Sequence, residues 1–208
     1  MAAGEGLEDP DSAGNKNVAE FVNASLWSGT LADFREKASG ADPVPAGVAI
    51  SAVTASLALA LVAKVLLIAG KRRNVSALLE IARAESAQLA DLADRDIRAF
   101  EQYMSTGDML PAIEVPMEAA RAVVRGLGVC VEAAGIVKGL TAADIGAAAA
   151  LLSGALQAML LSVDFNLQYM RAREQFSLRI TAERGELERE ALLLADVVTA
   201  AIKQDRPE

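Results

Sequence analysis

Apolar residues recur every three or four positions between residues 75 and 106, which predicts a long amphipathic helix. The inward stripe of this helix contains Leu78, Ala82, Ser86, Leu89, Leu92, Asp96, Phe100 and Tyr103. Asp96 therefore points towards the expected core. Asp94 lies about 200° further round the helix. Its partner at the surface is expected to be Arg98, four residues later.

The same kind of pattern along the chain predicts an all-α fold, a bundle of about six helices without a clear strand pattern. The expected helices cover roughly residues 17–38, 46–70, 75–106, 116–137, 141–173 and 174–204. Gly185 marks a point where the last helix can bend. Two Ala-rich segments, 46–70 and 145–163, are apolar on all sides, which is typical of central helices surrounded by others.

Residues 1–16 are small, polar and acidic, so we expect a disordered tail before a single helical domain over 17–208. The segment 46–70 also has the length and apolar character of a transmembrane helix, and basic residues follow it. Lys64 interrupts that segment, and the second segment like it suits a soluble bundle. A small helical membrane protein therefore stays a less favoured alternative.

The composition of the chain argues against several classes of function. The net charge of −8 in 208 residues argues against a nucleic-acid partner. The one cysteine, Cys130, lies on an apolar helix side, so we expect a core thiol and a reducing, cytoplasmic compartment. The chain has no histidine, which excludes a Ser-His-Asp triad, a Cys-His pair and the usual zinc-hydrolase ligand sets. No metal-ligand spacing is present, so proton transfer would need a carboxylate, lysine or tyrosine.

Asp96 is the first candidate for such chemistry. Burial raises the pKa of a carboxyl group, and a raised pKa suits a general acid that works near neutral pH. Two other interpretations stay open on the pattern alone: a narrower apolar stripe that leaves Asp96 in water, or a buried ion pair.

Each of the other polar positions can be interpreted either as a structural feature or as part of a functional site. Asp144 follows Thr141 at the spacing of a capping box, which would account for both residues without any chemistry. Asn166 lies in an apolar helix, and a buried amide there needs core partners or a polar ligand. Lys71, Arg72 and Arg73 follow a central helix, where cations are favoured and an anionic ligand could also bind.

Several short motifs stand in one order along the chain. They are Pro43-Val44-Pro45-Ala46-Gly47-Val48-Ala49, the basic group Lys71-Arg72-Arg73, Asp94-Arg95-Asp96-Ile97-Arg98-Ala99-Phe100, Val115-Pro116-Met117, Lys138 to Asp144, and Ser162-Val163-Asp164-Phe165-Asn166-Leu167. In this order they resemble the cyclodeaminase/cyclohydrolase family, which includes the C-terminal domain of formiminotransferase-cyclodeaminase and small methenyltetrahydrofolate cyclohydrolases. The resemblance covers roughly residues 28 to 200. The chain departs from the family pattern where loop glycines and a serine are Ala46, Val48 and Ala49, and where Lys138 and Ser162 replace asparagines.

The resemblance implies an enzyme that acts on the carbon bridging N5 and N10 of tetrahydrofolate, with the folate as substrate and no tightly bound cofactor. It implies that Asp96 is the proton donor. It implies further that Gly47, Lys138, Asp144 and Asn166 belong to the substrate pocket, and that the basic group 71–73 receives the folate's glutamate carboxylates. Two very apolar helices in a short chain also suggest a homodimer. A non-catalytic relative that binds a changed ligand or a protein partner stays the alternative.

Overall fold

Helices make up nearly all of the chain that the structure, a computed structural model, describes: residues 25–70, 75–170 and 174–204. They are a 3-10 helix η1 (Leu26–Ser28) and the α-helices α2 (Leu31–Ala38), α3 (Gly47–Ala69), α4 (Ser76–Thr106), α5 (Leu110–Ile136), α6 (Leu140–Tyr169) and α7 (Glu174–Gln204). Within these ranges there is no strand, and the all-α prediction is confirmed. The predicted tail, 1–16, and the basic group, 71–73, lie outside the described residues.

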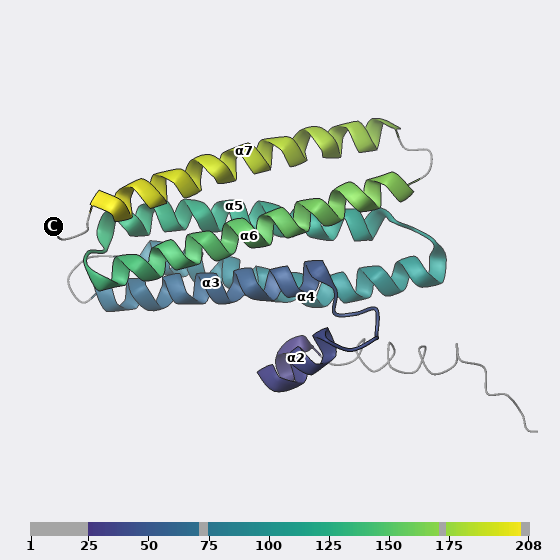
Figure 1. The fold of residues 1–208 in the computed structure, drawn as a ribbon, viewed down its shortest axis with the longest axis horizontal. Coiled ribbons are helices and arrows are strands. Elements are labelled where there is room, and N and C mark those ends of the chain that lie inside the picture. Colours follow the sequence, from purple (N-terminus) through teal and green to yellow (C-terminus); the bar gives the residue numbers. More distant parts are fainter. Residues whose placement is uncertain (1–24, 71–74, 171–173, 205–208) are drawn as a thin grey trace, which may run out of the picture.

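The long helices run up and down along one axis (Figure 1). In cross-section α3, α4, α5 and α6 form a closed square, since each packs against the next and α6 packs back on α3. α7 lies over the groove between α5 and α6, and it runs without interruption through Gly185. One end of the bundle therefore gathers the start of α3, the end of α4, the start of α5 and the end of α6 (Figure 1). That end contains the site described below.

Small residues allow the helices to approach closely across the square. Leu59 of α3 is fully buried and fills the space beside Gly126 of α5, where an added Cβ would lie 3.1 Å from the Leu59 Cδ2 atom. Cys130, on the same helix as Gly126, is also fully buried, as predicted. Burial raises the pKa of its thiol to about 12, so the group is an inert part of the core.

The two Ala-rich helices are central, but the prediction that other helices surround them on all sides is wrong. Both α3 and α6 are long and apolar enough to cross a membrane, and only about half of each spanning stretch is buried in the bundle. The remainder forms an exposed apolar face of adjacent helices, which we call the α3/α6 face: Ile50, Leu57, Leu67, Ile68, Leu151, Leu161 and Phe165. Apolar side chains exposed on neighbouring helices are typical of a surface that binds a partner.

The first predicted helix differs from the structure. Described residues begin at 25, and the predicted single helix is divided there into η1 and α2. The reason is local capping: Thr30 accepts the Asp33 N–H, and the Asp33 carboxylate accepts the Thr30 N–H, which starts a new helix. No residue of α2 is fully buried, and Phe34 is its one side chain that packs against the main core among the described residues.

The start of α5 was also predicted wrongly. The helix begins at Leu110, and Pro111 rather than Pro116 occupies its first turn. Pro116 lies inside the helix, where its ring nitrogen cannot donate a hydrogen bond to the carbonyl of Ala112. The structure compensates for this loss from α6, as described for the site.

Asp94 does not pair with Arg98. Its carboxylate accepts the backbone N–H of Leu26 at 2.8 Å, and the Trp27 indole N–H donates to the Ala90 carbonyl at 3.0 Å. Both bonds fasten η1 to α4. Arg98 lies 3.9 Å from Asp91 instead.

Candidate functional site

Asp96 lines a cavity of about 200 Å³ at the end of the bundle where α3 begins. The other lining residues come from the loop before α3 and from α3, α4, α5 and α6: Val44, Ala46, Gly47, Val48, Phe100, Tyr103, Met109, Ala112, Ser162 and Asn166. Three of the predicted site residues, Gly47, Asp96 and Asn166, therefore meet in one cavity. The inward stripe of α4 delivers Asp96, Phe100 and Tyr103 to it, as its period predicted.

The Asp96 carboxylate also completes the N-terminus of α3. A helix starts with free N–H groups, and a side chain at the cap normally accepts one of them. The cap residue here is Ala46, which has no such group. Instead, the Asp96 Oδ2 atom accepts the Ala49 N–H at 3.1 Å. The Oδ1 atom has no hydrogen-bond partner among the described residues, and the side chain remains partly accessible through the cavity.

Burial raises the pKa of Asp96 to about 6, and the hydrogen bond from Ala49 opposes this rise. The alternative of a buried ion pair does not apply within the described residues. The nearest arginine in sequence, Arg95, bonds to Glu118 of α5 at 2.8 Å. The carboxyl is thus sheltered, has no cation beside it among the described residues, and has a pKa of about 6. These are the properties of a proton-transfer group.

Asn166 binds a backbone carbonyl of α5. Its Nδ2 atom donates to the Ala112 oxygen at 2.7 Å, and Ala112 is the residue whose helical partner would have been the missing N–H of Pro116. The amide of α6 therefore replaces the hydrogen bond that the proline removes. The Asn166 side-chain oxygen is not used in this bond, so it remains as an acceptor in the cavity wall.

One of the altered residues, at the start of α3, lines the cavity. Val48, where the family pattern has a glycine, is almost fully buried and lines the cavity directly. Gly47 keeps the backbone open: an added Cβ there would come within 3.9 Å of the Ser162 hydroxyl. On this side of the cavity, an apolar side chain therefore stands where the family pattern has a glycine.

Asp144 and Lys138 lie at the opposite end of α6. Asp144 and Asn166 are separated by 22 residues of one helix, or about 33 Å. The capping box expected at Thr141 and Asp144 does not form. The helix begins at Leu140 after Gly139, and the Thr141 hydroxyl donates to the Lys138 carbonyl. One chain alone does not bring Asp144 to Asp96.

Sequence reasoning did not assign Tyr103, Met109 or Ala112 to the site. A tyrosine or methionine on an apolar stripe is typical of a core residue. Every residue has a backbone carbonyl group, so the sequence does not indicate which carbonyl lies in a site. Pro116 was a usable signal for Ala112, because a proline inside a helix frees the carbonyl four residues before it. In the described ranges, no three or more His, Cys, Asp or Glu residues cluster to hold a metal.

Fold and cavity together define a helical-bundle protein with a sheltered carboxyl at one end of the bundle. A family model described as formiminotransferase-cyclodeaminase matches residues 30–111 and 107–185, and the chain belongs to this family of folate cyclodeaminases and cyclohydrolases. The two matched segments meet at the connection between α4 and α5. The resemblance found in the sequence is therefore confirmed.

Solved structures include one of the same fold. The crystal structure of formiminotetrahydrofolate cyclodeaminase from Thermotoga maritima superposes with a TM-score of 0.80 at 22% sequence identity. The alignment covers 86% of this chain and 98% of that one. No curated protein matches the sequence.

Asp96→Asn should change how stability depends on pH. The folded-state pKa of about 6 lies above the ordinary value of 3.8, so the unfolded chain ionises first as pH rises. The free energy of unfolding of the wild type, relative to Asp96→Asn, should fall by about 1 to 3 kcal/mol between pH 4 and pH 7. Urea unfolding of both proteins at each pH measures this. A pH-independent difference would contradict the sheltered carboxyl.

The Asn166–Ala112 bond can be tested by a double-mutant cycle with Pro116. Asn166→Ala should cost about 1 kcal/mol of unfolding free energy, because it leaves a partly buried carbonyl without its donor. In a Pro116→Ala background the restored N–H can bond that carbonyl, so the cost should shrink. Pro111→Ala, in the first turn, is the matched control and should not rescue. Additive costs for Asn166→Ala and Pro116→Ala would show that the two positions are not linked.

Proposed function

We propose that this protein is a folate one-carbon enzyme, a methenyltetrahydrofolate cyclohydrolase or a formiminotetrahydrofolate cyclodeaminase. Asp96 would act as the general acid and base. The observation that carries the proposal is the Asp96 carboxyl itself: it opens onto a cavity, has no cationic partner in the described chain, and has a pKa of about 6. Membership of the family supplies the substrate class.

Both reactions need one group that moves a proton. In cyclohydrolysis, water adds to the methenyl carbon and loses a proton to the Asp96 carboxylate. The proton then returns to the nitrogen that leaves as the carbon–nitrogen bond breaks. In cyclodeamination, N10 attacks the formimino carbon, and the same carboxyl passes the N10 proton to the departing ammonia. A carboxyl poised near pH 6 can serve in both directions.

Asn166 and Gly47 would line the bound folate beside Asp96. The amide of Asn166 is fixed by the Ala112 carbonyl, so its free oxygen can orient a pterin N–H or the attacking water. Gly47 lets the ligand approach the backbone at the start of α3. No tightly bound cofactor is required for this chemistry, and a cytoplasmic location agrees with the folate substrate.

A homodimer would account for the remaining predicted residues. A two-fold axis across the α3/α6 face would pair these helices of two copies in opposite directions. The cavity end of one copy would then lie beside the far end of the other, with Lys138 and Asp144 of the partner subunit. The basic group 71–73 follows the same far end in sequence and would be available for the folate's glutamate carboxylates.

A non-catalytic relative is the second candidate, and the altered loop favours it. Val48 fills part of the cavity wall where the family pattern has a glycine, so the cavity could suit a ligand other than a folate. Tight binding of folate without turnover would support the non-catalytic relative, whereas turnover by the wild type would support the enzyme.

The activity assay uses purified protein with 5,10-methenyl- and 5-formimino-tetrahydrofolate in parallel, followed by absorbance. Asp96→Asn should lower kcat about 100- to 10,000-fold, the usual contribution of a general acid or base. The cyclohydrolase kcat/KM of the wild type should rise with pH through about 6. Asp94→Asn is the matched control: Asp94 only fastens η1 and should leave kcat unchanged. Retained turnover in Asp96→Asn would remove Asp96 from the mechanism.

Sedimentation equilibrium tests the dimer. The wild type should have twice the 21.7 kDa mass of the chain, and Leu57→Asp or Phe165→Asp on the α3/α6 face should reduce it to a monomer. Leu193→Asp, an exposed leucine of α7, should leave the mass unchanged. A wild type that sediments as a monomer rejects this interface.

A further inference from the structure

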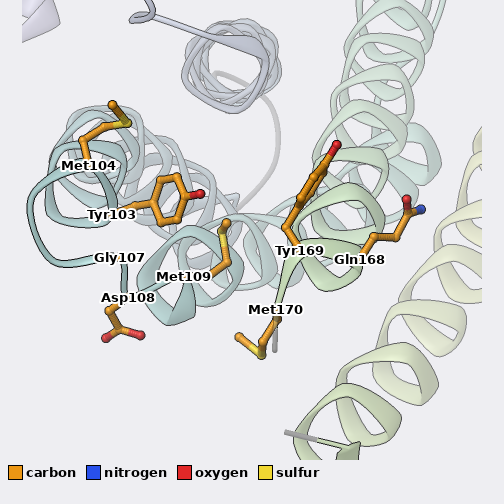
Figure 2. A pocket seen from close by; sticks show the side chains of 8 residues that line it. All are labelled: Tyr103, Met104, Gly107, Asp108, Met109, Gln168, Tyr169 and Met170. Carbon is orange, nitrogen blue, oxygen red and sulfur yellow. The ribbon is translucent and has the colours of Figure 1, made fainter. Parts of the chain in front are cut away.

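A second, larger cavity adjoins the one that contains Asp96. Its volume is about 770 Å³, against about 200 Å³ for the inner cavity. It lies where α4 passes into α5 and where α6 ends, and Figure 2 shows the eight lining residues: Tyr103, Met104, Gly107, Asp108, Met109, Gln168, Tyr169 and Met170. Tyr103 and Met109 line both cavities and form the boundary between them.

The sizes of the cavities imply that they work together. Sites for small organic ligands usually measure about 300 to 1,000 Å³, so the inner cavity is too small for more than a compact ring system. A longer ligand that places a reacting atom beside Asp96 can continue past Tyr103 and Met109, which line both cavities. The outer cavity is the space into which it would pass.

Two tyrosine rings and three methionine side chains are among the residues that line the outer cavity. In Figure 2 the rings of Tyr103 and Tyr169 stand on opposite sides of the space, with the Met109 side chain between them. Aromatic rings and thioethers are favourable neighbours for another flat ring. The Asp108 side chain points away from this space, and its carboxylate caps α5 by accepting the Leu110 N–H at 3.1 Å.

The short connection that shapes this cavity depends on Gly107, whose φ of 73° is a left-handed conformation that suits glycine.

We propose that the outer cavity is the second compartment of the ligand site and binds a flat aromatic ring joined to the group beside Asp96. This rests on the proposed function: in a tetrahydrofolate the aminobenzoyl ring is attached to N10, next to the carbon that reacts. The pterin would occupy the inner cavity, and the aminobenzoyl ring would lie between Tyr103 and Tyr169.

The test uses two half-molecules as probes, 6-methyltetrahydropterin and N-(4-aminobenzoyl)glutamate, with binding measured by calorimetry on the full chain. Tyr169 is 70% exposed, so Tyr169→Ala should leave the fold intact. This variant should weaken binding of the aminobenzoyl probe about three- to tenfold, the contribution of one aromatic contact. It should leave the pterin probe unaffected. Tyr169→Phe keeps the ring and should bind as the wild type does.

Leu193→Ala is the control, because Leu193 is 68% exposed on α7 and lines neither cavity. Unchanged aminobenzoyl affinity in Tyr169→Ala would overturn the proposal. So would an equal loss for both probes, or a change in oligomeric mass instead of affinity, which would make Tyr169 a subunit contact.

The same experiment separates this inference from the proposed function. If the wild type binds the aminobenzoyl probe but turns over neither folate, the cavity assignment stands and the enzymatic function is removed. If the wild type turns over folate with a KM that Tyr169→Ala does not change, the enzyme stands and the cavity assignment is removed. Binding of neither probe would remove the cavity assignment, and the enzymatic function would then be decided by turnover alone.

Discussion

The buried contact of Asp96 with the start of α3 determines both the shape of the site and the pKa of the Asp96 carboxyl. It supplies α3 with a cap that Ala46 cannot provide, and so it holds the start of α3 against α4. The same contact lowers the pKa of the carboxyl while burial raises it, and burial dominates. Only one oxygen is used, so a proton can bind the other without breaking the cap. Structural and chemical roles are therefore compatible in one side chain.

A second contact of this kind sets the opposite wall. Pro116 would normally weaken α5 by freeing the Ala112 carbonyl, and the Asn166 amide of α6 replaces the lost donor. The compensation explains why α5 starts before the proline and not at it. The sequence predicted helices 75–106 and 174–204 well because their periodicity is long. It failed at residues 17–38 and at 116, where a local capping box and a tertiary hydrogen bond override the pattern.

The sequence predicted those site residues whose polar side chains lie at positions where a helical core has apolar ones. Asp96 could be found because it is the one carboxylate on an apolar stripe, and Asn166 because a buried amide needs a partner. Tyr103 and Met109 suit such a core and so look like core residues. Their position beside a cavity depends on how α4 turns into α5, where the three residues 107–109 leave no periodic signal. Pattern reasoning finds polar residues in apolar places, and it misses apolar residues that line a space.

The separation of Asp144 from Asn166 restricts how the predicted residues could share one ligand. Both lie on α6, and a continuous helix cannot fold back to bring together residues about 33 Å apart. No rearrangement of loops within one chain changes that distance. If the two groups serve one ligand, the second must come from another copy. The α3/α6 face runs between them and exposes large apolar side chains, which a two-fold contact would bury in the antiparallel sense that such a site needs.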